Sequence, residues 1–133
     1  MKRLLITLLF LSFSLVACGQ QKKEKGKQKE MFYEWIFARS VQGQTELVLK
    51  DKSRVDVVTD TFAIEVEFAP KWAESIGQSL YYAQMLNKKP GIVLIVNGQQ
   101  ENRYIFRLLT VTRKYGITVW ILDYNTNKFG RTK

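Results

Sequence analysis

The chain has 133 residues, enough for one compact domain with short appendages, and its 46% hydrophobic content is typical of a globular protein. It contains no histidine, which excludes an imidazole base and metal centres with imidazole ligands, and its one cysteine excludes an internal disulfide and a thiolate zinc cluster. Of the formal charge of +9, Lys2 and Arg3 contribute +2 and residues 19–29 contribute +4, which leaves +3 for the remaining chain. The high overall charge is therefore weak evidence for a nucleic-acid partner.

The first 18 residues have the composition of an export signal. Two cationic residues precede an apolar run over residues 4–16, which is shorter than the about 20 residues that a membrane-spanning helix needs. The run ends in the sequence LVAC, whose last residue is the only cysteine, Cys18. This ending resembles the bacterial lipobox, which implies removal of residues 1–17, a lipid on Cys18 and anchoring to a membrane of the bacterial cell envelope. A plain signal peptide with an incidental cysteine is the alternative.

Residues 18–29 form a predicted tether between the lipid and a domain at 30–133. From residue 20 onward this stretch is polar, rich in lysine and without any apolar side chain. Such a composition cannot bury a core, so we expect a solvated spacer, with attraction of its lysines to anionic lipid or nucleic acid as an additional role.

Residues 30–68 predict one helix followed by three antiparallel strands. Apolar side chains recur at helical spacing over 30–39, and the glycine in residues 42–44 interrupts the pattern. A strand is predicted over 45–49, and the alternating residues 54–68 predict a hairpin with its turn at Asp60 and Thr61.

The second half of the domain predicts two further helices and two buried strands. Pro70 suits the first turn of a helix that runs to about Leu86. The apolar run 91–96 predicts a buried strand, 101–114 an amphipathic helix, and 117–122 a second buried strand. Because a strand–helix–strand unit is a natural parallel crossover, we expect an α/β domain with a mixed central sheet between helices.

The hairpin places several acidic residues close together. With the predicted turn, residue 57 faces 64, 56 faces 65 and 54 faces 67. One face then carries the predicted core residues Phe62, Ile64, Val66 and Phe68 with Val55 and Val57, and the other carries Arg54, Asp56, Val58, Ala63, Glu65 and Glu67. Like charges directly opposite each other destabilise a sheet, although Arg54 opposite Glu67 offsets part of the repulsion. A divalent cation between Asp56 and Glu65 would offset far more, and a solvated face that tolerates acids is the alternative.

The helix after the hairpin carries polar residues that suit phosphodiester hydrolysis. One stripe of this helix consists of Lys71, Glu74, Gln78 and Tyr82, and another side carries Trp72, Ile76 and Leu80. The helix directly follows the third strand, so its first turn comes close to the predicted carboxylates. In such a site the acids hold a metal ion, the ion lowers the pKa of a water molecule, and the lysine orients or deprotonates that water. A half-exposed helix surface is the alternative for Gln78 and Tyr82.

Residues 45–96 resemble the PD-(D/E)xK nuclease superfamily. In RVD, Asp56 falls at the proximal acid of that pattern; in EVE, Glu65 falls at the second acid; and QSLYY matches the Gln-x-x-x-Tyr helix of the exonuclease branch. The resemblance implies a restriction-endonuclease-like αβββαβ core with a final helix–strand unit, Mg²⁺ or Mn²⁺ on Asp56 and Glu65, and nucleic acid as substrate. The residues that it implies for catalysis are Asp56, Glu65, Glu67, Lys71, Gln78 and Tyr82, with Glu34 or Glu46 as an additional acid.

The chain departs from that pattern at one position. The lysine expected in the acid-x-Lys tripeptide is Glu67 here, and Lys71 at the start of the next helix is the candidate to replace it. If Lys71 does not reach the site, the domain is a catalytically inactive relative on an exported lipoprotein, which binds nucleic acid or another protein. The helix 101–114 also carries Arg103 and Arg107, which together with Arg54 are candidates for phosphate contact, and a solvated charged face is the alternative for that helix.

Overall fold

The computed structural model describes residues 29–132. The predicted signal peptide, Cys18 and nearly all of the tether lie outside these residues. The chain divides into two units, Met1–Phe32 and Tyr33–Lys133. Of the first unit only residues 29–32 are described, and they are helical. All that follows concerns the second unit.

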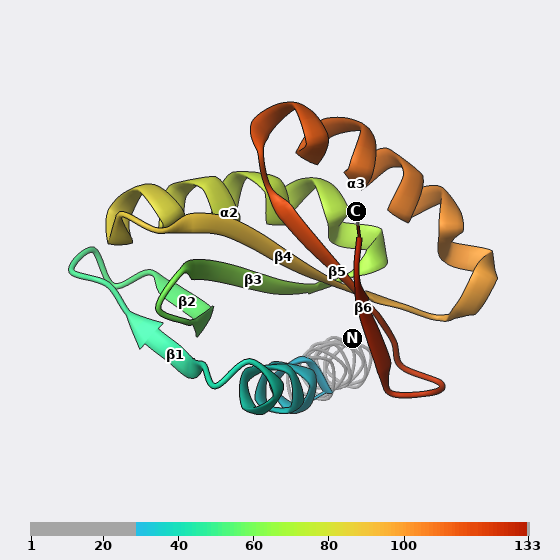
Figure 1. Cartoon of the computed structure of the whole chain (residues 1–133), viewed down its shortest axis with the longest axis horizontal. Helices are drawn as coiled ribbons and strands as arrows, with labels where there is room; N and C mark the ends of the chain where they lie inside the picture. Colours follow the sequence, from blue (N-terminus) through green and yellow to red (C-terminus); the bar gives the residue numbers. More distant parts are fainter. Residues whose placement is uncertain (1–28, 133) are drawn as a thin grey trace, which may run out of the picture. The chain divides into compact units, whose positions relative to one another are not determined.

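The second unit begins with the rest of a helix that ends at residue 40 and continues into three antiparallel strands (Figure 1). These strands are β1 (Gln44–Val48), β2 (Arg54–Val58) and β3 (Phe62–Phe68), and each pairs with the next. The predicted helix and the predicted antiparallel order are confirmed. Val57 pairs with Ile64, as the predicted turn requires.

The chain then crosses over twice to build the parallel part of the sheet. A short 3₁₀ helix, η1 (Ala69–Lys71), leads into α2 (Trp72–Leu86), and β4 (Lys89–Val96) lies parallel to β3. A second 3₁₀ turn, η2 (Gly98–Glu101), leads into α3 (Asn102–Tyr115), and β5 (Thr118–Asp123) lies parallel to β4. The predicted parallel crossover is therefore confirmed.

The last strand was not predicted from the sequence. β6 (Lys128–Arg131) pairs antiparallel with β5 and completes a six-stranded mixed sheet with its strands in chain order. All four of its residues are exposed, so it lacks the alternation of buried and exposed side chains that reveals a strand in sequence.

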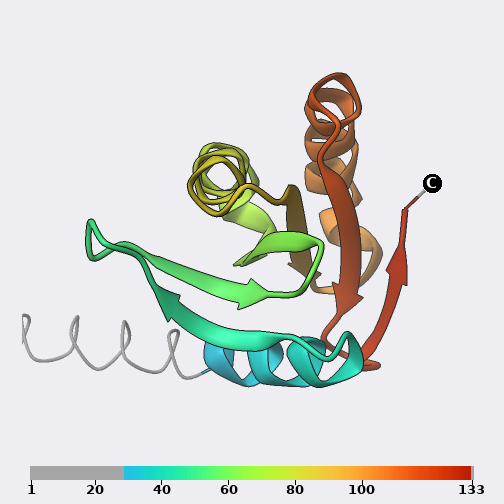
Figure 2. The same cartoon turned by 60° about the vertical axis from the view of Figure 1, so that its left-hand side comes forward.

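Two apolar layers cover the two faces of the central strands. Phe37 and Ala38 of the first helix pack with residues such as Ile64, Val66 and Trp120 on one face. On the other face Ile92, Leu94 and Val119 pack beneath α2 and α3, which lie side by side (Figure 2). This is an α/β arrangement with helices on both faces of a mixed sheet.

A third cluster corrects the face assignment of one residue. Val55 was predicted to share the core face of Val57, but it packs with Val58, Ala63 and Tyr82 beneath the end of α2. Strict alternation therefore fails along β2, because Val55 and Val58 share this cluster whereas Val57 packs with Ile64 and Val66 on the other face. Among residues 29–132 no helix has the length and apolar character required to cross a membrane.

Gly91 provides a test of the packing between β3, β4 and β5. A Cβ atom at Gly91 would lie 2.9 Å from Ile64 Cγ1 and 2.9 Å from Trp120 Cζ3, whereas one at Gly77 on exposed α2 would meet nothing within 4 Å. We expect Gly91→Ala to lower the free energy of unfolding by about 1–3 kcal/mol because the core is overpacked. Gly77→Ala should raise it by about 0.5–1 kcal/mol. Urea unfolding measures both, and equal effects of the two substitutions would contradict this packing.

Candidate functional site

Asp56 lies at the point where β2 separates from β3. The ladder between these strands consists of two pairs, Val57 with Ile64 and Val58 with Ala63. Beyond them the Val66 N–H donates a hydrogen bond of 2.8 Å to Asp56 Oδ2 rather than to a main-chain carbonyl of β2. The side chain of Asp56 thus satisfies a main-chain donor that the separation of the strands would leave without a strand partner.

Three carboxylates in this region are buried, which contradicts the alternative of a solvated acidic sheet face. Asp56, Glu65 and Glu67 are only 5%, 4% and 4% exposed. Carboxylates are rarely buried to this extent unless a cation or several hydrogen-bond donors compensate for the loss of water.

Lys71 reaches Glu67, as its proposed role requires. Lys71 closes η1, four residues after Glu67, and its Nζ lies 3.2 Å from Glu67 Oε2. The other oxygen, Glu67 Oε1, accepts the Phe68 N–H at 2.9 Å. The lysine side chain is half exposed while that of Glu67 is buried, so the pair connects the buried acids to solvent.

A second acid–base pair lies on the other side of Asp56. The pairing of Thr45 with Val57 and of Leu47 with Val55 puts Glu46 opposite Asp56, and Arg54 Nη1 lies 3.1 Å from Glu46 Oε1. Arg54 therefore pairs with Glu46 and not with Glu67 as the sequence predicted. The φ angle of Glu46 is 57°, a left-handed conformation that costs a non-glycine residue roughly 1–2 kcal/mol.

The Gln-x-x-x-Tyr pair of α2 also faces the acids. Tyr82 is buried, and Gln78 is hydrogen-bonded to it. The pKa of Tyr82 is raised, first by burial and then by the negative charges of Glu65 and Asp56. Both carboxylates therefore lie within electrostatic reach of the phenol, so the structure brings together residues of β2, β3 and α2 as the sequence analysis expected.

The electrostatics of this site are dominated by excess negative charge. Four acids (Glu46, Asp56, Glu65 and Glu67) lie around two cations (Arg54 and Lys71). Burial raises the pKa of Asp56 to about 6, the charges of Glu67 and Glu46 add to this increase, and the Val66 hydrogen bond and Arg54 oppose it. At neutral pH Asp56 is mostly ionised, but ionisation costs free energy.

The carboxylate oxygens of the buried acids are the type of ligand that a hard divalent ion prefers. Among residues 29–132 there is no group of three or more acidic, histidine or cysteine side chains that could hold a metal ion on its own. Mg²⁺, however, is commonly bound by one or two carboxylates, with water and substrate phosphate oxygens as the other ligands. Asp56 and Glu65 are both buried carboxylates within electrostatic reach of Tyr82, which is the donor chemistry that such an ion takes from a protein.

Three other predicted residues have different positions. Glu34 is buried on the first helix. Phe37 and Ala38 of the same helix pack against Ile64 and Val66, on the face of β3 opposite to the one that carries Glu65 and Glu67. Of the two candidates for the additional acid, Glu46 is therefore the one beside Asp56. Arg103 and Arg107 are exposed on α3, which packs on α2, η1 and β5.

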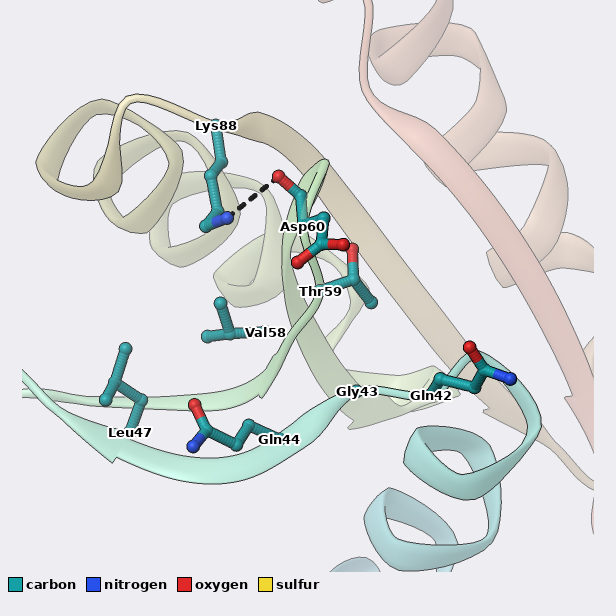
Figure 3. Close-up of a pocket in the computed structure, with 8 residues that line it drawn as sticks. All are labelled: Gln42, Gly43, Gln44, Leu47, Val58, Thr59, Asp60 and Lys88. Carbon is teal, nitrogen blue, oxygen red and sulfur yellow. Dashed lines mark hydrogen bonds between the residues drawn. The ribbon is translucent and has the colours of Figure 1, made fainter.

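Two surface clefts lie away from these residues. The larger, of about 440 Å³, lies between β1, the β2–β3 turn and Lys88, which follows α2 and whose Nζ donates to the Asp60 carbonyl at 2.9 Å (Figure 3). Gln44 and Leu47 line its other side. The smaller, of about 240 Å³, lies between the end of α3 and strands β5 and β6. None of the residues predicted for catalysis lines either cleft.

One contact of the site had no signal in the sequence. The donor that holds Asp56 is the main-chain N–H of Val66, and no side-chain pattern reveals which main-chain groups lose their strand partners.

Comparison of the chain with protein-family models, with curated proteins and with solved structures found no match.

The raised pKa of Asp56 predicts how stability depends on pH. Because the folded protein favours the protonated form of Asp56, the stability gained from this group is fully present below its unfolded pKa of about 4. It is lost as the pH rises through the folded pKa of about 6. Asp56→Asn keeps an acceptor for the Val66 N–H and removes the charge. Without divalent ions it should therefore raise the free energy of unfolding by about 2–3 kcal/mol at pH 8 and by little at pH 4.

Urea unfolding at both pH values in EDTA measures this difference. Asp60→Asn, at an exposed position, is the control and should change little at either pH. A destabilised Asp56→Asn protein at pH 8 would show that the ionised carboxylate stabilises the fold.

Proposed function

We propose that the chain is a metal-dependent phosphodiester hydrolase, a nuclease of the PD-(D/E)xK type, on an exported protein anchored through a lipid at Cys18. The observation that carries the proposal is the group of buried acids where β2 leaves β3, with Lys71 Nζ 3.2 Å from Glu67 Oε2. The element order, with three antiparallel strands, a helix and a parallel strand, agrees with the αβββαβ core of that superfamily.

Each residue has a role that follows from its position. Asp56 and Glu65 would hold Mg²⁺ or Mn²⁺, which when bound stabilises negative charge on a phosphate and lowers the pKa of a water molecule. Lys71 is half exposed, so its ammonium group can donate to incoming water or phosphate while Glu67 fixes its position. Tyr82 with Gln78 closes the α2 side of the site, and Arg54 with Glu46 closes the β1 side.

The lysine position distinguishes this proposal from an inactive relative. Glu67 stands where the superfamily pattern has lysine, and the contact between Glu67 and Lys71 places an ammonium group beside the same strand position. A catalytically inactive domain that binds nucleic acid or protein is the alternative, and it requires Lys71 only as a surface ion pair.

Thermal unfolding with and without Mn²⁺ tests metal binding. At a free Mn²⁺ concentration about 100 times its Kd, the folded state gains about 2.7 kcal/mol, which raises the unfolding midpoint by on the order of 10 °C. Glu65→Gln should abolish this rise. Glu74→Gln, at an exposed acid on α2, should retain it. An equal Mn²⁺ response in both variants would place the ion elsewhere.

Cleavage of DNA and RNA tests catalysis. Lys71→Ala should reduce the cleavage rate with Mn²⁺ by about 10²-fold or more, in the range of a group that moves or orients a proton. Its stability should change little because the Lys71 ion pair is half exposed. Lys50→Ala on the β1–β2 turn is the matched control and should cleave at the parent rate. A folded parent protein that binds Mn²⁺ but cleaves neither substrate would favour the binding module.

A further inference from the structure

The outer surface of α3 is cationic and contains no acid. Its sequence, NRYIFRLLTVTRKY, has four cationic residues, Arg103, Arg107, Arg113 and Lys114, all of them exposed. Because a helix turns 100° per residue, positions 103, 107, 110 and 114 form one stripe about 16 Å long. The buried residues Leu108 and Thr112 lie on the opposite side, against the sheet.

Aromatic residues lie between and beside these cations. Phe106 is 75% exposed, the highest value among the large apolar side chains of residues 29–132. The Arg103 guanidinium lies 4.7 Å from the centre of the Tyr104 ring, and Lys114 Nζ lies 5.8 Å from that of Tyr115. A protruding phenylalanine between arginines, on a convex helix, leaves an apolar group in water that no contact within the described chain covers.

We propose that this surface, which we call the α3 face (Arg103, Phe106, Arg107, Arg113 and Lys114), docks on an anionic lipid bilayer. Cations on a helix are attracted to acidic headgroups, and an exposed aromatic ring gains free energy by entering the boundary between headgroups and acyl chains. The smaller cleft adjoins the α3 face and adds a further cation, because Arg113 and Arg131 both line it.

The position of the α3 face argues for lipid rather than for nucleic acid bound to the catalytic site. α2 lies beside α3 on the sheet and separates it from the half of the sheet that carries Asp56 and Glu46 (Figure 2). A nucleic-acid strand bound along the cationic stripe of α3 would have to pass around α2 to reach those acids. A bilayer under α3 leaves the acids, which an anionic surface would repel, on the far side of α2 and open to solution.

The proposal does not depend on catalysis, and it agrees with the proposed lipid at Cys18. A lipid at Cys18 would hold the domain close to a membrane, where the cations and the aromatic ring of the α3 face could contact it. Docking of the α3 face would in addition fix the orientation of the domain, which a flexible tether cannot do.

Acylation of lysines by an amine-reactive ester, read by peptide mass spectrometry, tests the orientation directly. The full-length chain is mixed with vesicles of phosphatidylcholine and phosphatidylglycerol at a ratio of 3:1, or with pure phosphatidylcholine vesicles. With the mixed vesicles, acylation of Lys114 should fall at least five-fold while that of Lys50, exposed on the β1–β2 turn, stays unchanged. Pure phosphatidylcholine should protect neither lysine. Since Lys50 is in the same molecule, attachment through the amino-terminal segment cannot imitate this result.

Two variants identify the cause of the protection. Arg103→Gln with Arg107→Gln should weaken docking by roughly 25-fold, about five-fold for each cation near an anionic surface. Phe106→Ala should weaken it by about ten-fold through lost apolar burial. The matched controls are Arg39→Gln with Lys52→Gln and, separately, Val48→Ala. They change exposed residues of the first helix, the β1–β2 turn and β1, keep Lys50 as the reference, and should retain protection of Lys114.

Two results would overturn the proposal. In the first, Lys114 and Lys50 react at equal rates with the mixed vesicles. In the second, a 20-nucleotide single-stranded DNA in EDTA protects Lys114 while the mixed vesicles do not, which would make the α3 face a nucleic-acid surface. Cleavage assays report separately on the proposed nuclease, so loss of activity and loss of docking are distinguishable.

Discussion

The hydrogen bond from the Val66 N–H to Asp56 Oδ2 is the contact on which the organisation of the site depends. The main-chain ladder between β2 and β3 ends after two pairs. Beyond it, the Asp56 carboxylate replaces a main-chain carbonyl as the acceptor of the Val66 N–H. A side chain that performs this role is fixed at a strand boundary, and Asp56 is buried there. Glu67 and Glu46 then lie within electrostatic reach of Asp56, and Glu65 and Asp56 both lie within reach of Tyr82.

This arrangement stores unfavourable electrostatics in the folded protein. Burial and the neighbouring acids raise the pKa of Asp56 to about 6, so folding at neutral pH confines charge that water would solvate better. Natural proteins place such groups mainly where chemistry requires them. Here the two cations, Arg54 and Lys71, pair with Glu46 and Glu67 and not with Asp56. The strained φ angle of Glu46 adds to the same local cost.

Much of the fold followed from periodicity. The buried strands β4 and β5 and the helix between them were predicted within two residues of their ends, because continuous apolar runs and an amphipathic helix leave strong signals. β6 left none because all its residues are exposed, and Val55 misled because β2 does not keep regular alternation after it separates from β3.

The site was predictable in its residues but not in its contacts. Acids at positions 56 and 65 and the Gln78–Tyr82 spacing indicated which side chains share one face, and the register of Val57 with Ile64 was read correctly from the turn. That Arg54 would pair with Glu46 depends on the register of β1 with β2 and on the left-handed φ angle of Glu46, which no periodicity shows. The burial of Glu67 and its contact with Lys71 depend on the path of η1 after β3, which is a tertiary property.

The most direct test of the central claim is a crystal structure of the purified chain grown with Mn²⁺ and measured at a wavelength where manganese scatters anomalously. We predict an anomalous peak at a coordination distance of about 2.0–2.6 Å from a carboxylate oxygen of both Asp56 and Glu65. A peak absent from that position, with Asp56 still bound to the Val66 N–H and Glu65 turned away from it, would show that the buried acids serve the fold alone.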